Sequence, residues 1–295
     1  MAALSSVSFG RAVIVLAVLM QALGKVAYGT WLGAVPSNLF VFLSFALTAA
    51  FFLAVSRRGV GEQAWGALLL LNAATALTFI SFFYALKLIE PAIVGAVEIG
   101  IGPVIVVLIA MATTGERPSP LRVLVCLGIL GGCAVLGMAA LRGSGFASFG
   151  PQAWIGLGAS VAAGVGAVLI TLSSRALLNR GWRFGAVLAH RFYLILPASL
   201  VLAIGSGGAP VAWTGGLVAM FLVVSVIGVL APLYLLQIGI GRCDPYTVMV
   251  TMAALPVLTF AIEGFSPAYA WSWLTALGVA IVSGFLLLDV AAKRD

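Results

Sequence analysis

The chain has 295 residues, of which 63% are hydrophobic and 8% charged, and its formal net charge is +7 at pH 7. Soluble globular proteins carry about 25% charged residues, so this composition excludes an apolar core inside a charged, water-facing shell. A spanning helix needs about 20 apolar residues, so the length accommodates about ten spans and little else. The chain is therefore predicted to lie in a lipid bilayer, with no room for a soluble catalytic domain or a nucleic-acid-binding domain.

Continuous apolar runs, separated by charged, proline or glycine residues, predict ten transmembrane helices. They are expected at about 12–34, 38–56, 64–86, 91–114, 121–141, 153–174, 184–204, 214–238, 245–264 and 270–290. Each run is longer than a buried strand requires, and an outer-membrane barrel would show short alternating segments instead. The predicted fold class is an all-α polytopic membrane protein with short loops.

The basic residues predict the orientation of these helices. Lys87 and Arg142 fall on outer segments and Lys25 and Arg191 within helices, which leaves eleven of the 15 basic residues on cytoplasmic segments. This excess predicts an inner (cytoplasmic) membrane protein with both termini cytoplasmic. The seven Trp residues lie near helix ends, as expected for anchors in the membrane interface.

Motifs of catalysis and metal binding are missing from the sequence. The three cysteines form no disulfide framework, and the single histidine, His190, cannot build a zinc site unaided. There is no P-loop, no HExxH and no G-x-S-x-G motif. We therefore expect no catalytic residue, no metal and no cofactor, and a protein that is not an enzyme.

The two halves of the chain share a weak, collinear pattern. Glu90-Pro91 followed by Pro103-Val104 is echoed by Asp244-Pro245 followed by Pro256-Val257. Two homologous units of five helices each cross the membrane an odd number of times, so the second unit must be inverted. Inverted repeats are a recurrent transporter construction, with the substrate site near the midplane between them. The predicted repeats cover residues 1–145 and 146–295.

These features resemble the drug/metabolite transporter superfamily, specifically its ten-helix EamA-type exporters. The resemblance rests on the five-plus-five helices, the acidic-Pro dipeptides, the prolines inside the fourth and ninth helices, and Gly115-Glu116-Arg117 closing the fourth. By general likeness the sequence is most similar to the bacterial aromatic amino-acid exporters. The resemblance implies a central cavity lined by helices 1, 3, 4, 6, 8 and 9, with helices 5 and 10 at the periphery.

Two charged residues are the main candidates for substrate contact. A charge inside a spanning helix faces a cavity, a partner or both, because its exposure to lipid is costly. At 1.5 Å per residue, Lys25 lies about 20 Å from the inner face and Glu98 about 10 Å from the outer face. The two can thus face each other, either as substrate ligands or as a static ion pair between helices 1 and 4. Arg191 is closer to the inner face and is predicted to be a snorkelling anchor.

Polar and aromatic stripes supply the other substrate-site candidates. They are Tyr28, Phe79, Phe83, Tyr84, Ser160, Tyr234, Gln237 and Thr251. Aromatic stripes are more often packing than ligand contacts, and small residues around Ser160 favour close helix approach, so packing stays open for these residues. Small-residue faces on the fifth and tenth helices suit packing within a monomer or a weak homodimer.

One ammonium, one carboxylate and several aromatic rings complement a zwitterionic amino acid. The predicted function is export of small zwitterionic metabolites, aromatic or large apolar amino acids, by alternating access. Arginine clamps for phosphate are missing from mid-membrane, which disfavours nucleotide-sugar or sugar-phosphate antiport. A multidrug exporter of lipophilic cations is the other alternative, since Glu98 beside aromatic rings could hold a cation.

Overall fold

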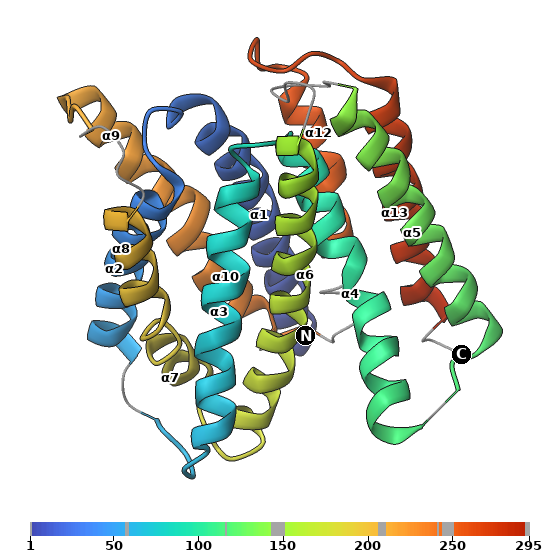
Figure 1. The fold of residues 1–295 in the computed structure, drawn as a ribbon. Helices are drawn as coiled ribbons and strands as arrows, with labels where there is room; N and C mark the ends of the chain where they lie inside the picture. The colour runs from blue at the N-terminus through green and yellow to red at the C-terminus, as the bar shows by residue number, and fades with distance from the viewer. Residues whose placement is uncertain are drawn as a thin grey trace.

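The computed structural model describes residues 2–56, 59–115, 117–142, 151–205, 211–240, 242–243 and 251–292, and over these residues the protein is all-α (Figure 1). The elements are α1 (Ala2–Trp31), α2 (Ser37–Ser56), α3 (Trp65–Ala85), α4 (Pro91–Thr114), α5 (Pro120–Leu141), α6 (Pro151–Leu178), α7 (Phe184–Ala189), α8 (Ile195–Gly205), α9 (Gly215–Val223), the π-helix η1 (Val224–Leu230), α10 (Ala231–Ile240), α12 (Leu255–Glu263) and α13 (Trp273–Ala292).

The described helices are long and apolar enough for a multi-pass membrane protein. Seven of them meet the length and hydropathy expected of a span, and shorter apolar helices cover Ile195–Gly205, Thr251–Glu263 and Trp273–Leu288. Roughly ten helical segments therefore correspond to the ten predicted runs. The run expected at 245–264 falls within the described residues only from Thr251 onward.

Proline and glycine set several helix ends. Pro91, Pro120 and Pro151 are the first residues of α4, α5 and α6, where the missing N–H of proline removes no helical hydrogen bond. Gly115 ends α4 in the left-handed region at φ 67°, a conformation that a side chain would strain. The boundaries of the fourth helix, which the sequence places at Glu90-Pro91 and Gly115, are confirmed.

A break interrupts the seventh predicted run, so the continuous helix expected over 184–204 is wrong. The buried side chain of Asn72 on α3 lies at this break: its Nδ2 donates to the His190 carbonyl at 3.0 Å, and its Oδ1 accepts from the Tyr193 N–H at 2.8 Å. An amide from another helix thus satisfies backbone groups that α7 and α8 leave open. Each such group would cost about 1–3 kcal/mol if it were buried without a partner.

The eighth predicted run is a composite of α9, η1 and α10. The π-helix η1 crosses α1, and the two backbones are in contact at this crossing. A Cβ on Gly228 would lie 2.9 Å from the Cα of Gly24. Glycine at both positions permits this approach. π-Helical turns are frequent at functional sites, and this one lies beside the residue that precedes Lys25.

Helices α5 and α13 pack against each other at one edge of the molecule (Figure 1). A Cβ on Gly132 would lie 2.7 Å from Val282, and one on Gly278 would lie 2.6 Å from Leu136. These glycines therefore allow the two helices to approach closely within one chain. Gly284, on the predicted small-residue face of the last helix, has open space around it.

Candidate functional site

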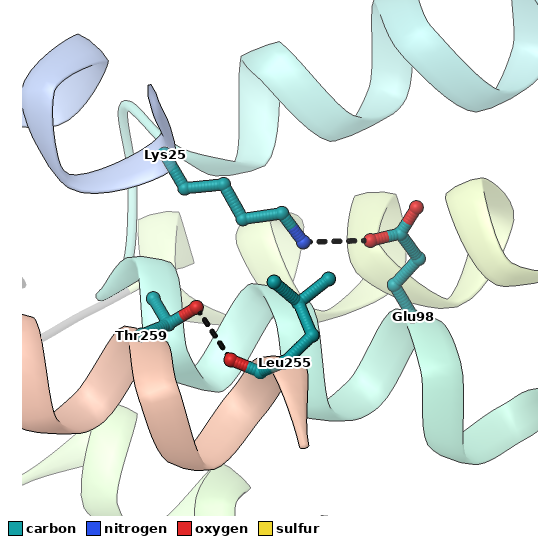
Figure 2. Close-up of polar contacts among 4 residues, drawn as sticks. All are labelled: Lys25, Glu98, Leu255 and Thr259. Carbon is teal, nitrogen blue, oxygen red and sulfur yellow. Dashed lines mark hydrogen bonds and ion pairs between the residues drawn. The ribbon is translucent and has the colours of Figure 1, made fainter. Parts of the chain in front are cut away.

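Lys25 and Glu98 meet inside the bundle. The Lys25 Nζ lies 3.3 Å from the Glu98 Oε2, and the two side chains are 8% and 17% exposed. Figure 2 shows the ammonium of α1 pointing at the carboxylate of α4. Within the described part of the chain no other ion pair is formed. The proximity expected from the depths of these two residues is confirmed.

Aromatic and small residues form the wall around the ammonium. The Lys25 Nζ lies 4.5 Å from the centre of the Phe82 ring on α3, a cation–π contact. A Cβ on Gly95 of α4 would lie 3.2 Å from the same nitrogen, so glycine leaves room for it. Phe82 was missed by the sequence analysis, because it lies beside the stripe that contains Phe79 and Phe83.

Helix α12 closes the opposite side of the ion pair. Its first residue, Leu255, is 1% exposed, and its side chain lies beside the pair in Figure 2. The Leu255 carbonyl accepts a 2.8 Å hydrogen bond from the Thr259 hydroxyl of the same helix (Figure 2). Since α12 contacts both α1 and α4, the ion pair lies where helices from the two halves of the chain meet.

Three predicted site residues belong to an aromatic cluster in the core. The Tyr28 ring lies 4.6 Å from Phe40 and 5.0 Å from Phe83, and Phe79 lies 4.6 Å from Phe45. Tyr28 and Phe83 are buried, so they also serve the packing role that was left open for aromatic stripes.

The remaining predicted site residues are not gathered around the ion pair. Ser160 is buried and donates to the Gly156 carbonyl of its own helix, which accords with packing. Tyr84 is 41% exposed at the surface of α3. Thr251 is half-buried. Gln237 belongs to α10, but its side chain lies outside the described residues.

Tyr234 lines a separate pocket of about 440 Å³ between α2, α7 and α10. Phe52 of α2, Leu188 of α7 and Arg242 after α10 also line it, whereas Lys25 and Glu98 do not. The Tyr234 and Phe52 rings are 6.3 Å apart. The pocket volume is comparable to that of small-molecule sites.

Arg191, in the break between α7 and α8, is 4% exposed. Its Nε donates to the Thr75 hydroxyl at 3.3 Å, and its guanidinium lies 5.8 Å from the Phe79 ring and 5.6 Å from the Phe192 ring. The snorkelling anchor expected for Arg191 is therefore wrong, because neighbouring helices hold the guanidinium inside the protein.

The fold and the buried ion pair define a multi-pass membrane protein with charged groups inside its helical bundle. Residues 8–138 match the EamA-like transporter family. The match covers less than half of the chain, and over these residues the chain is similar to a family of membrane transporters.

The other comparisons concern the fold. A solved structure described only as "Crystal structure of protein" aligns with 98% of this chain and 98% of its own length, with a TM-score of 0.62 and 23% sequence identity. This likeness shows that the helical arrangement is shared over the whole chain. None of the curated proteins compared matches the sequence.

Proposed function

We propose that this protein is a membrane transporter of the EamA type, which exports small zwitterionic metabolites, aromatic or large apolar amino acids, by alternating access across the inner membrane. The observation that carries the proposal is the Lys25–Glu98 pair, 3.3 Å apart and only partly exposed. A substrate α-carboxylate can replace Glu98 at the ammonium, and a substrate α-ammonium can replace Lys25 at the carboxylate. Phe82 and Leu255 supply an apolar surface beside the charges.

We also propose that residues 1–145 and 146–295 are inverted repeats. Helix α3, the third of the first half, packs along α6, the first of the second half. Helix α1, the first of the first half, packs along η1 and α10, which belong to the third run of the second half. The two pairings become each other when the halves are exchanged. The pairing of α5 with α13 is unchanged by that exchange, as is the pairing of α2 with α7 and α8. This symmetry supports a site at the junction of the halves, where Lys25 and Glu98 meet.

The proposed orientation has both termini in the cytoplasm, on the basis of the eleven basic residues assigned to that side. A reporter active only in the cytoplasm, fused after Asp295, is expected to be active. The same reporter inserted between α8 and α9 is expected to be inactive. Activity of a periplasm-specific reporter after Asp295 would overturn this orientation.

Overproduction in cells tests the substrate class. We expect a lower intracellular pool of an aromatic or large apolar amino acid, and growth in the presence of its toxic analogue, because export removes both. Cells that produce equal amounts of the Lys25→Met/Glu98→Leu variant are the matched control and should remain sensitive. Unchanged sensitivity to every such analogue, together with resistance to lipophilic cations, would favour the multidrug alternative.

A further inference from the structure

Two carboxyl groups are buried where the N-terminus of α4 meets the C-terminus of α12, away from the Lys25–Glu98 pair. Glu90, at the N-cap of α4, is 2% exposed, and Glu263, the last residue of α12, is 3% exposed. The Glu90 Oε2 accepts from the Thr275 hydroxyl at 3.0 Å. The Glu263 Oε1 accepts from the Ala92 N–H at 2.7 Å. Both groups therefore lie at the N-terminus of α4.

Tyr269, in the loop between α12 and α13, lies near both carboxyl groups. Burial, followed by the charges of Glu263 and then Glu90, raises the pKa of the Tyr269 hydroxyl above its ordinary value. The same hydroxyl packs against Gly29 of α1, where it leaves no room for an added Cβ. The carboxyl pair thus joins α4 of the first half to α12, α13 and their loop in the second half.

Basic groups do not neutralise this pair. Among the described residues, neither carboxylate has a lysine, arginine or histidine within ion-pair distance. The nearest basic residue in sequence, Lys87, is turned toward the Leu32 and Gly33 carbonyls, and α13 contributes only the neutral Thr275. The second oxygen of Glu90, Oε1, is buried without a hydrogen-bond partner. An ionised carboxylate left in that position is strongly disfavoured.

We propose that Glu90 and Glu263 form a proton-binding site that holds one proton in common and thereby keeps this end of the protein closed. Two carboxylates at close range cannot both stay ionised in a dry site. Loss of the proton leaves two negative charges between α4 and α12, and their repulsion separates these helix ends. The pH of the compartment at this end then controls its opening, whatever the transported substrate is.

A proton fits the pair better than a metal ion does. The two carboxyl groups supply four oxygens, and two of these already accept hydrogen bonds from Thr275 and Ala92. Calcium takes about six to eight oxygen ligands, and magnesium requires an octahedral set. The described residues also contain no group of three or more acidic, cysteine or histidine side chains that could hold a metal.

The direction of the pH effect follows from the burial of Glu90. Burial raises the pKa of this carboxyl from its usual 4.5 to about 7, and the Thr275 hydrogen bond opposes the shift only in part. Because the native protein then holds a proton that the unfolded chain has lost, its stability falls as the pH rises from about 4.5 toward 7. Lys87, whose pKa burial lowers to about 8, keeps its proton in this range.

Thermal unfolding of the full chain in detergent, without substrate, tests the site. Between pH 5 and 7.5 the Tm of the unmodified protein should fall by about 3 °C or more. The Glu90→Gln/Glu263→Gln variant carries two neutral amides in place of the acids, so its Tm should change by less than about 1 °C over the same range. Glu62→Gln, which alters an exposed carboxyl, should keep the fall of the unmodified protein.

A Tm of the unmodified protein that does not change with pH would overturn the proposal. The proposal would also be overturned if the Tm of the double variant fell with pH as much as that of the unmodified protein. The same holds if sodium ions at pH 7.5 raised the Tm as much as lowering the pH does. If the double variant does not fold, infrared spectroscopy decides: the carbonyl band of a buried protonated carboxyl should be present at pH 5 and disappear as the pH is raised. In Glu90→Gln the band should shift in frequency, because an amide replaces one of the two carboxyl groups that hold the proton. No substrate enters these measurements, so they stand even if the protein does not transport amino acids.

Discussion

Lys25→Met and Glu98→Gln are each expected to reduce substrate counterflow at least tenfold. The loss of transport should exceed what the accompanying decrease in the free energy of unfolding can explain. Removing one partner of a fully buried pair costs about 3–5 kcal/mol because the other charge is left uncompensated. Here the side chains are 8% and 17% exposed, so solvent reduces that cost. The loss of transport should be larger because the remaining charge can bind only one end of a zwitterion.

The double variant Lys25→Met/Glu98→Leu separates a transport site from a structural ion pair. Two apolar side chains leave no orphan charge, and such replacements of buried pairs are often neutral or stabilising. A purely structural pair would therefore be replaced without loss of transport. If both charges bind substrate, the double variant should have a Tm within about 3 °C of the unmodified protein and no counterflow.

Counterflow in proteoliposomes and unfolding in detergent should be measured on the same preparations. Thr113→Val is a suitable control, because this exposed hydroxyl bonds only to the Ile109 carbonyl of its own helix. It should leave both measurements unchanged. Full transport by a well-folded double variant would show that Lys25 and Glu98 only join α1 to α4.

Gly24→Val is expected to destabilise the protein by about 3 kcal/mol and to abolish counterflow. Gly24 lies against the backbone of Gly228. Because both contacting segments are main chain, neither can move aside in the way that a flexible side chain could. The added side chain must push α1 away from η1. Because Lys25 is the next residue, the same displacement moves the ammonium relative to Glu98, and a shift of about 1 Å can lower a positioned reaction or binding step about 100-fold.

Gly131→Val on α5 is the matched control for this substitution. A Cβ at Gly131 meets nothing within 4 Å, so only the difference in helix propensity remains, a few tenths of a kcal/mol in favour of valine. Its Tm and its counterflow should match those of the unmodified protein. Equal loss in both variants would show that the glycine contact between α1 and η1 has no special role.

The membrane class and the positions of most helices could be predicted because apolar runs and proline boundaries are local properties. The Lys25–Glu98 contact could be predicted too, because depth along a helix follows from a fixed rise per residue. The π-helical turn could not, because Gly24 and Gly228 are far apart in the sequence. The break at His190 is held by Asn72, 118 residues away, so the partner could not be predicted, although Pro197, the third residue of α8, is a local signal for a helix start.

The buried carboxyl pair was also hidden from sequence reasoning. Glu90 precedes a proline at a helix start and Glu263 ends a helix, positions where an acidic residue is normally solvated. Only the packing of α12 and α13 over the N-terminus of α4 buries both side chains. The Glu90-Pro91 dipeptide was a signal for the helix boundary but carried no information about the partner 173 residues later.

Exchange in proteoliposomes with one matched set of compounds tests the central claim most directly. The set contains a radiolabelled aromatic amino acid, its decarboxylated amine, its deaminated acid, a nucleotide sugar and a lipophilic cation. A site with one ammonium and one carboxylate should exchange the amino acid at least tenfold faster than the amine or the acid, because each lacks one of the two charge contacts. Equal or faster exchange of the amine, the lipophilic cation or the nucleotide sugar would contradict a zwitterion site at Lys25 and Glu98.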